Sequence, residues 1–186
     1  MRKIIIQDML TVDGFFCGPN GEIDWHAVDG EFNEYAIGVL NTVDTLMFGR
    51  VTYELMARYW PTPEGQKDNA AIADKMNGLQ KIFFSKSEQN MDWNNSTVRH
   101  EIDANEITRM KQAPGKDIII FGSGTIVDAL AKLGLIDEFR FIVNPVILGK
   151  GKTLFPTVEG GRKLKLLRTQ TFASGNVLSC YEPIAR

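Results

Sequence analysis

The chain has 186 residues, of which 44% are hydrophobic and 24% are charged, and its formal net charge is −2. This length and balance predict one ordinary globular domain. A net charge so close to zero gives no general attraction to nucleic acid or to an anionic membrane. The apolar run near the start, Ile4–Ile6, is interrupted at Gln7 and Asp8, whereas the core of a signal peptide needs roughly 7–15 apolar residues. We therefore expect a cytoplasmic protein without nucleic-acid or membrane partners.

Cysteine and histidine residues give no sign of a metal site. Cys17 and Cys180 are far apart in the sequence, and His26 and His100 lack the spacing of metal ligands. We expect both cysteines to be small buried side chains in a reducing compartment, and we expect no bound metal.

Apolar periodicity and turn-forming residues predict strands and helices that alternate along most of the chain. In its first half the predicted elements are a strand over Lys3–Gln7, a turn over Thr11–Phe16, a loop over Gly18–Gly21, a helix over Asp29–Leu40, a strand over Thr45–Phe48, a helix over Thr52–Tyr59, a mobile surface loop over residues 61–69, a helix over Ala70–Asn77 and a strand over Lys81–Phe84. In its second half they are a loop over Asn90–Asn95, a strand over Thr97–Arg99, a helix over Glu106–Gln112, a strand over Ile118–Phe121, a helix over Thr125–Leu133, a strand over Glu138–Val143, and the strands Leu164–Phe172 and Asn176–Glu182.

This order predicts an α/β fold with a mostly parallel sheet of about eight strands and helices on both faces. Ile4–Ile6 and Ile118–Phe121 are apolar over consecutive residues, which is typical of central strands buried on both faces, so we expect them to be neighbours. The last two strands alternate in polarity and should form an antiparallel edge. Such sheets bind ligands at the carboxyl ends of their strands.

Three predicted strand ends carry small residues followed by potential anion ligands. The first turn contains Gly49, Arg50 and Thr52; the second contains Ser85 and Lys86; the third contains Gly122, Ser123, Gly124 and Thr125. Glycine lets the backbone approach a phosphate, and a helix that begins there presents free N–H groups. Each turn alone is more often structural than functional, but together they predict a phosphate-binding rim. The third turn has Val127 where the dinucleotide fingerprint has glycine, so an ordinary Rossmann site is not predicted.

The order of several short motifs resembles the dihydrofolate-reductase-like superfamily, in the branch related to the reductase domain of the riboflavin-biosynthesis protein RibD. The motifs are Leu10–Phe15, Leu46–Glu54, Asp117–Gly124, Leu135–Glu138, Pro145–Gly151 and Leu154–Phe155. The resemblance implies an NADPH-binding reductase that forms a homodimer through its C-terminal strands. It places Gly49, Arg50 and Thr52 at the phosphates, Ser85 and Lys86 at the 2′-phosphate side, and the third turn at the pyrophosphate and nicotinamide.

The chain departs from its apparent relatives at positions that bear on the substrate. It has Gln7 and Leu40 where the riboflavin-pathway domain commonly carries a lysine and an arginine, so reduction of a phosphorylated aminopyrimidine is not expected. Dihydrofolate reductases use a carboxylate in the first helix. Asp29, Glu31 and Glu34 are available there, but none can be matched to it, and no general acid is assigned.

Two further residues are candidates for substrate binding. Asp13 either polarises a substrate or holds its Asp-Gly turn, and the turn is the simpler interpretation. Trp25 either lines a substrate pocket or caps the core. We interpret Trp60 as a packing residue.

The leading hypothesis is an NADPH-dependent reductase that transfers a hydride to a small organic substrate, pterin- or pyrimidine-like or otherwise. The alternative is a nucleotide-binding homodimer without catalysis, because the sequence identifies no general acid. An FMN-binding flavodoxin-like protein is disfavoured, since no hydroxyl-rich loop follows the first strand.

Overall fold

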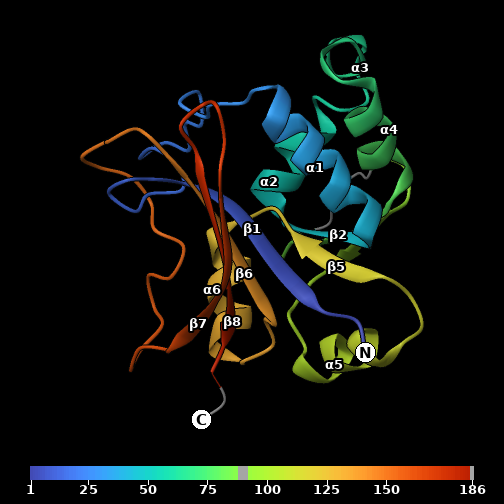
Figure 1. Ribbon diagram of the computed structural model, residues 1–186. Coiled ribbons are helices and arrows are strands. Elements are labelled where there is room, and N and C mark those ends of the chain that lie inside the picture. The colour runs from blue at the N-terminus through green and yellow to red at the C-terminus, as the bar shows by residue number, and fades with distance from the viewer. Residues whose placement is uncertain (88–91, 185–186) are drawn as a thin grey trace.

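The computed structural model describes residues 1–87 and 92–184, which form one eight-stranded sheet flanked by helices (Figure 1). The strands are β1 (Ile4–Thr11), β2 (Val43–Gly49), β3 (Gln80–Phe84), β4 (Ser96–Arg99), β5 (Asp117–Ile120), β6 (Glu138–Asn144), β7 (Leu164–Thr171) and β8 (Val177–Pro183). The helices are α1 (Gly30–Thr42), α2 (Arg50–Ala57), α3 (Pro63–Asp68), α4 (Ala70–Gly78), α5 (Ala104–Gln112) and α6 (Gly124–Lys132). The loop predicted over Asn90–Asn95 begins outside the described residues.

The predicted sheet architecture is confirmed. The strand order is β4-β3-β2-β5-β1-β6-β8-β7; the first six strands are parallel, while β8 and β7 are antiparallel to their neighbours. β1 and β5 are adjacent, with Ile4 opposite Ile118 and Ile6 opposite Ile120. These four isoleucines are fully buried, as consecutive apolar residues in a central strand require.

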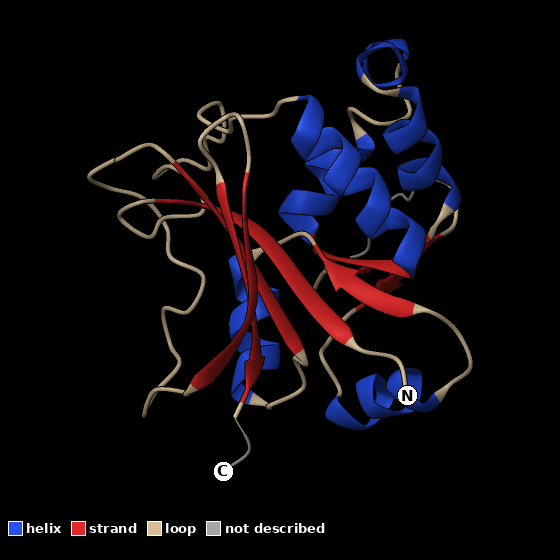
Figure 2. Ribbon diagram, in the orientation of Figure 1, coloured by secondary structure: helices blue, strands red, loops and turns tan. Residues whose placement is uncertain are grey.

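Helices cover both faces of the sheet, as predicted (Figures 1 and 2). On one face α1, α2 and α4 pack buried side chains such as Leu40 and Met76 around Ile5 and Ile119. On the other face α5 and α6 pack theirs around Ile4 and Ile118. Among the described residues, no helix is long and apolar enough to cross a membrane. Both cysteines are buried with free thiols, as expected.

Two local predictions were wrong. Residues 61–69 are not simply a loop, because they contain the short helix α3. Thr62 caps this helix by accepting a hydrogen bond from the Gly65 backbone, and Pro63 occupies its first turn, where proline is favoured because no backbone donor is needed. The first strand is also longer than predicted. β1 continues to Thr11 because it pairs with β6 over seven residue pairs, and this extension brings Asp8 inside the sheet.

Candidate active site

The three predicted turns meet in one cleft at the carboxyl ends of β2, β3 and β5. This cleft, here called the rim cleft, has a volume of about 410 Å³. Its lining residues are Gly49, Arg50, Val51, Phe84, Ser85, Lys86, Ser87, Ser123, Thr125 and Ile126. Helices α2 and α6 both begin here, and neither has a side chain that caps its first turn. Their unpaired N–H groups therefore give the cleft the character of an anion site.

Glycine at position 49 is required by the close approach of two turns. A Cβ atom on Gly49 would overlap the Ser123 hydroxyl, so any larger residue would push the β5–α6 turn away. Gly122 has a φ of 84°, which residues with side chains rarely adopt. The peptide bond between Gly122 and Ser123 is cis.

The two cations of the rim cleft differ in their partners. Arg50 Nη1 donates a hydrogen bond of 2.8 Å to Glu54 Oε1, one helical turn along α2, and the Arg50 side chain remains 46% exposed. Lys86 is exposed at the end of β3. The Ser85 hydroxyl donates to the backbone carbonyl of Ser87 at 3.0 Å. Arg50 and Lys86 are thus exposed enough for both to reach an anion in the cleft.

A second cleft continues the rim cleft along the sheet edge. This middle cleft has a volume of about 270 Å³ and shares Val51, Ser123 and Thr125 with the rim cleft. Predicted residues Thr52, Gly122 and Gly124 line it. The described part of the site therefore offers an elongated groove that suits a ligand longer than a single phosphate.

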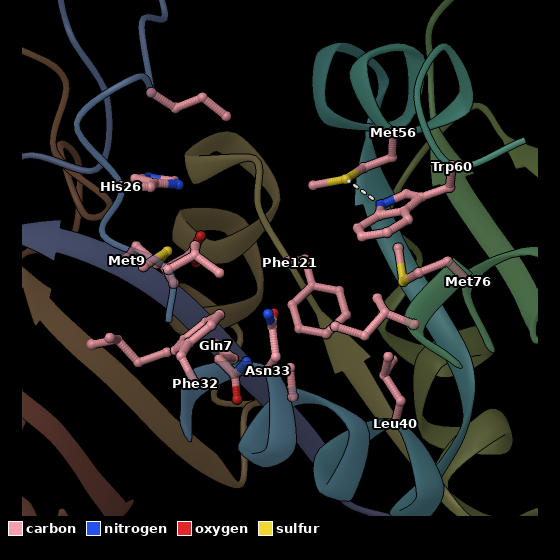
Figure 3. A pocket seen from close by; sticks show the side chains of 16 residues that line it. Gln7, Met9, His26, Phe32, Asn33, Leu40, Met56, Trp60, Met76 and Phe121 are labelled. Carbon is pink, nitrogen blue, oxygen red and sulfur yellow. Dashed lines mark hydrogen bonds between the residues drawn. The ribbon is translucent and has the colours of Figure 1, made fainter. Parts of the chain in front are cut away.

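An apolar cavity opens from the far end of the middle cleft, bounded by β1, α1, α2 and α4 (Figure 3). Its volume is about 260 Å³. The lining residues are Gln7, Asp8, Met9, Ile23, His26, Val28, Phe32, Asn33, Ala36, Leu40, Met56, Trp60, Ile72, Met76, Phe121 and Ile142. In Figure 3, Gln7, Phe32 and Asn33 lie on one side of the cavity and Met56 and Trp60 on the opposite side. No lysine or arginine is among these lining residues.

Asp8 lies where the middle cleft and the cavity meet, since it lines both. Its side chain is buried, and its Oδ2 atom has no hydrogen-bond partner among the described residues. A Cβ atom added to Gly122 would lie 3.4 Å from Asp8 Oδ1 and 3.3 Å from the Thr52 hydroxyl oxygen. Both groups therefore face Gly122. Burial raises the pKa of the Asp8 carboxyl from 3.8 to about 8, because an ionised carboxylate loses its hydration without gaining a partner.

His26 lines the same two spaces, and its Nε2 atom is likewise buried without a partner in the described structure. Burial lowers the pKa of its imidazole from 6.5 to about 4, since the charged ring would lose its hydration. At neutral pH both ionisable groups that line the cavity are therefore uncharged.

Neither of the two predicted substrate residues is among the residues that line the cavity. The Asp13 carboxylate accepts hydrogen bonds from the backbone of Leu148 and Gly149, and these bonds join its turn to a distant segment of the chain. Trp25 packs edge-on against His26, with ring centroids 4.5 Å apart, and donates to the Glu22 carbonyl. Trp25 thus supports a cavity residue, and its role as a direct substrate ligand stays a prediction.

The acidic residues of the first helix also lie elsewhere. Asp29 caps α1 and accepts a hydrogen bond from the Ser174 backbone, and Glu31 accepts one from Ala173. Glu34 is exposed. The polar residue of this helix that does line the cavity is Asn33.

Sequence reasoning missed most of the cavity. The predicted strand ends at Gln7, so Asp8 lies outside every predicted element and was not considered as a site residue. Trp60 was interpreted as packing, yet it lines the cavity, where its Nε1 donates to Met56 Sδ at 3.2 Å. One sequence signal did point to the cavity: Gln7 and Leu40, the two departures from the family pattern, both line it.

Comparison with known proteins shows the family of this chain. Residues 2–178 match the RibD C-terminal domain family. The chain belongs to this family. It is 35% identical over 182 residues to the uncharacterized protein YyaP of Bacillus subtilis strain 168, covering 97% of this chain and 94% of that protein. A further B. subtilis member of uncharacterized function, YwjB, is 30% identical over 172 residues, which are 92% of each chain.

Solved structures show the same fold at low sequence identity. A putative riboflavin biosynthesis protein from Shewanella sp. PV-4 superposes with a TM-score of 0.74 at 18% identity and full coverage of both chains. Dihydrofolate reductase from Enterococcus faecalis, solved in complex with NADP(H), superposes with a TM-score of 0.65 at 15% identity, covering 97% of this chain and 96% of that one. The fold is therefore dihydrofolate-reductase-like, as the sequence predicted.

Proposed function

We propose that this member of the RibD C-terminal domain family is an NADPH-dependent reductase of a small, uncharged and largely apolar organic molecule. The observation that carries the proposal is the continuity of the groove. A cleft with the features of an anion site leads through Gly122 and Thr52 into an apolar cavity with a buried carboxyl group at its entrance.

The residues of the groove fit a nicotinamide dinucleotide phosphate. Two helix N-termini and the cations Arg50 and Lys86 supply charge complementarity for phosphate groups. Gly122 and Gly124 allow a flat ring to approach the backbone beside the cavity. The cofactor would supply the hydride, and the protein would hold it and exclude water.

The cavity sets the class of substrate. A phosphate or carboxylate placed there would lose its hydration without gaining a cation, because its lining contains no lysine or arginine. Gln7 and Leu40 occupy two of the lining positions, and the Gln7 side-chain oxygen already accepts a hydrogen bond from the Tyr35 hydroxyl at 2.7 Å. The substrate is therefore uncharged, and it is not the phosphorylated aminopyrimidine of riboflavin biosynthesis.

Titration of both cofactors against wild type and Arg50→Ala tests the cofactor assignment. Charge-assisted hydrogen bonds contribute about 1.5–3 kcal/mol each, so the loss of Arg50 should weaken NADPH binding by about 10- to 100-fold. This test assigns Arg50, together with Lys86, to the 2′-phosphate; NADH lacks that group and should lose much less. Glu54→Gln is the matched control, because it breaks the same ion pair and leaves the cation; NADPH binding should be unchanged or tighter. An equal loss for both cofactors, or no loss for either, would contradict the assignment.

Loss of NADPH absorbance with a panel of flat carbonyl and imine compounds, each paired with its sulfonated analogue, tests the reaction. We expect turnover with uncharged members of the panel and none with the sulfonates. Preference for the sulfonates would refute the substrate class. NADPH binding without turnover of any compound would instead favour the non-catalytic nucleotide-binding protein.

A further inference from the structure

Asp8 is a buried acid at the junction of two spaces that the proposed reaction would use. It comes from the central strand β1 and lines both the middle cleft and the apolar cavity. One of its oxygen atoms faces Gly122, and the other is buried without a hydrogen-bond partner among the described residues. A buried, unpaired oxygen in a native fold calls for an explanation, and an absent ligand is one.

Burial favours the neutral form of Asp8. His26 lines the same spaces, and Cys17 and Lys152 line the middle cleft. Within the described ranges no hydrogen bond or ion pair joins Asp8 to any of them, and its pKa is governed by burial. A neutral carboxyl group can donate a hydrogen bond, whereas an ionised one can only accept.

We propose that the Asp8 carboxyl group is the proton donor of the reduction, hydrogen-bonding the nitrogen or oxygen atom of an uncharged C=N or C=O substrate held in the apolar cavity. This rests on the proposed function. A reduced nicotinamide held in the groove would supply the hydride, with its electron pair, to the carbon atom. The π pair moves to the heteroatom, which takes the proton of Asp8, and the carboxylate left behind is reprotonated from water.

Other ionisable groups near the cavity are less suitable donors. His26 has a pKa of about 4, so at neutral pH it carries no proton to give as an acid. Asp29 and Glu31 are engaged with the backbone of the β7–β8 turn. Asp8, with a pKa of about 8, still holds its proton at neutral pH and is acidic enough to release it, which is the range that general acid catalysis needs.

Binding of two uncharged probes tests this role without any turnover. Quinoline has a ring nitrogen that accepts a hydrogen bond, and naphthalene has the same shape without it. Below pH 8 wild type should prefer quinoline over naphthalene by about 3- to 10-fold, the value of one neutral hydrogen bond. Asp8→Leu should abolish this preference. Asp8→Asn should keep it, since the amide can donate, but should fail to protonate a substrate.

The pH dependence of binding distinguishes a hydrogen bond donated by Asp8 from a quinoline preference that depends on shape alone. Above pH 8 the quinoline preference of wild type should fall to that of Asp8→Leu over about one to two pH units, because only the neutral acid donates, while Asp8→Asn should keep its preference. A quinoline preference that survives in Asp8→Leu, or that is indifferent to pH around 8, would overturn the proposal.

If a variant fails to fold, the pKa of Asp8 can be measured in wild type by NMR titration of its ¹³C-labelled carboxyl carbon. An apparent pKa close to the ordinary 3.8 would also overturn the proposal. NADPH titration in the same samples keeps the outcomes distinct, since failure of cofactor binding refutes the proposed function, and failure of the quinoline preference refutes only the role of Asp8.

Discussion

Replacing Asp8 by asparagine should change how the stability of the fold depends on pH. The pKa of Asp8 is raised from 3.8 to about 8 by burial, so between these values the folded protein binds one proton more than the unfolded chain. The free energy of unfolding contributed by this group therefore falls by about 1.4 kcal/mol for each pH unit. Over the whole interval the loss reaches about 5–6 kcal/mol at most. Asparagine keeps the shape and cannot ionise, so the variant lacks this loss.

His26 acts in the opposite direction. Its pKa falls from 6.5 to about 4, so over that interval the unfolded chain binds the extra proton, and stability rises with pH by about 3 kcal/mol at most. Between about pH 4 and pH 6.5 the contributions of Asp8 and His26 to the free energy of unfolding have opposite slopes and nearly cancel. Between about pH 6.5 and pH 8 only the contribution of Asp8 still changes with pH. The wild-type curve by itself would therefore mislead. The difference between wild type and Asp8→Asn isolates the carboxyl group.

Urea unfolding followed by tryptophan fluorescence at a series of pH values measures this difference. We expect wild type to lose about 1.4 kcal/mol per pH unit relative to Asp8→Asn from about pH 4 to pH 8, and to lose nothing more above that range. Asp13→Asn is the matched control. The exposed Asp13 has a lowered pKa, because it is stabilised first by a side-chain hydrogen bond with Thr11; its contribution is present above its unfolded pKa and is lost in acid. A difference curve for Asp8 that is flat, or that rises with pH, would refute the reasoning.

Two other predictions concern the fold and its assembly. Lys81→Met should lower the free energy of unfolding by about 2–4 kcal/mol, because the buried Lys81 ammonium donates to three carbonyls at the end of α4; the exposed Lys67→Met should change it by under about 0.5 kcal/mol in the same urea titration. Wild type should have the mass of a homodimer by light scattering at micromolar concentration, because the edge strand β7 exposes Leu166 and Leu167. Leu166→Lys should give a monomer, and a monomeric wild type would contradict the dimer.

The course of the sheet could be predicted from the sequence because it depends on local patterns. Ile4–Ile6 and Ile118–Ile120 are apolar over consecutive residues, which only a strand buried on both faces accommodates. The rim of the site followed from the same pattern. Since parallel strands end at one edge, the small residues after β2, β3 and β5 had to come together there.

Residues 61–69 show where local patterns are ambiguous. Two prolines and a glycine predicted a loop, but proline in the first turn after a threonine cap is equally compatible with a helix. The packing of α3 against α4 favours the helix over the loop, and the amino-acid composition of the segment does not reveal that contact.

Asp8 marks the boundary between what the sequence determined and what only the tertiary structure decided. The sequence by itself determined the buried strands, the turns that follow them and the absence of two family cations at Gln7 and Leu40. It could not determine that β1 runs on to Thr11 beside β6, nor that α1, α2 and Phe121 enclose the cavity that Asp8 enters. The pKa of a carboxyl group depends on how much water and which partners surround it. Those surroundings come from segments distant in the chain, so the chemistry of Asp8 exists only once they have packed around it.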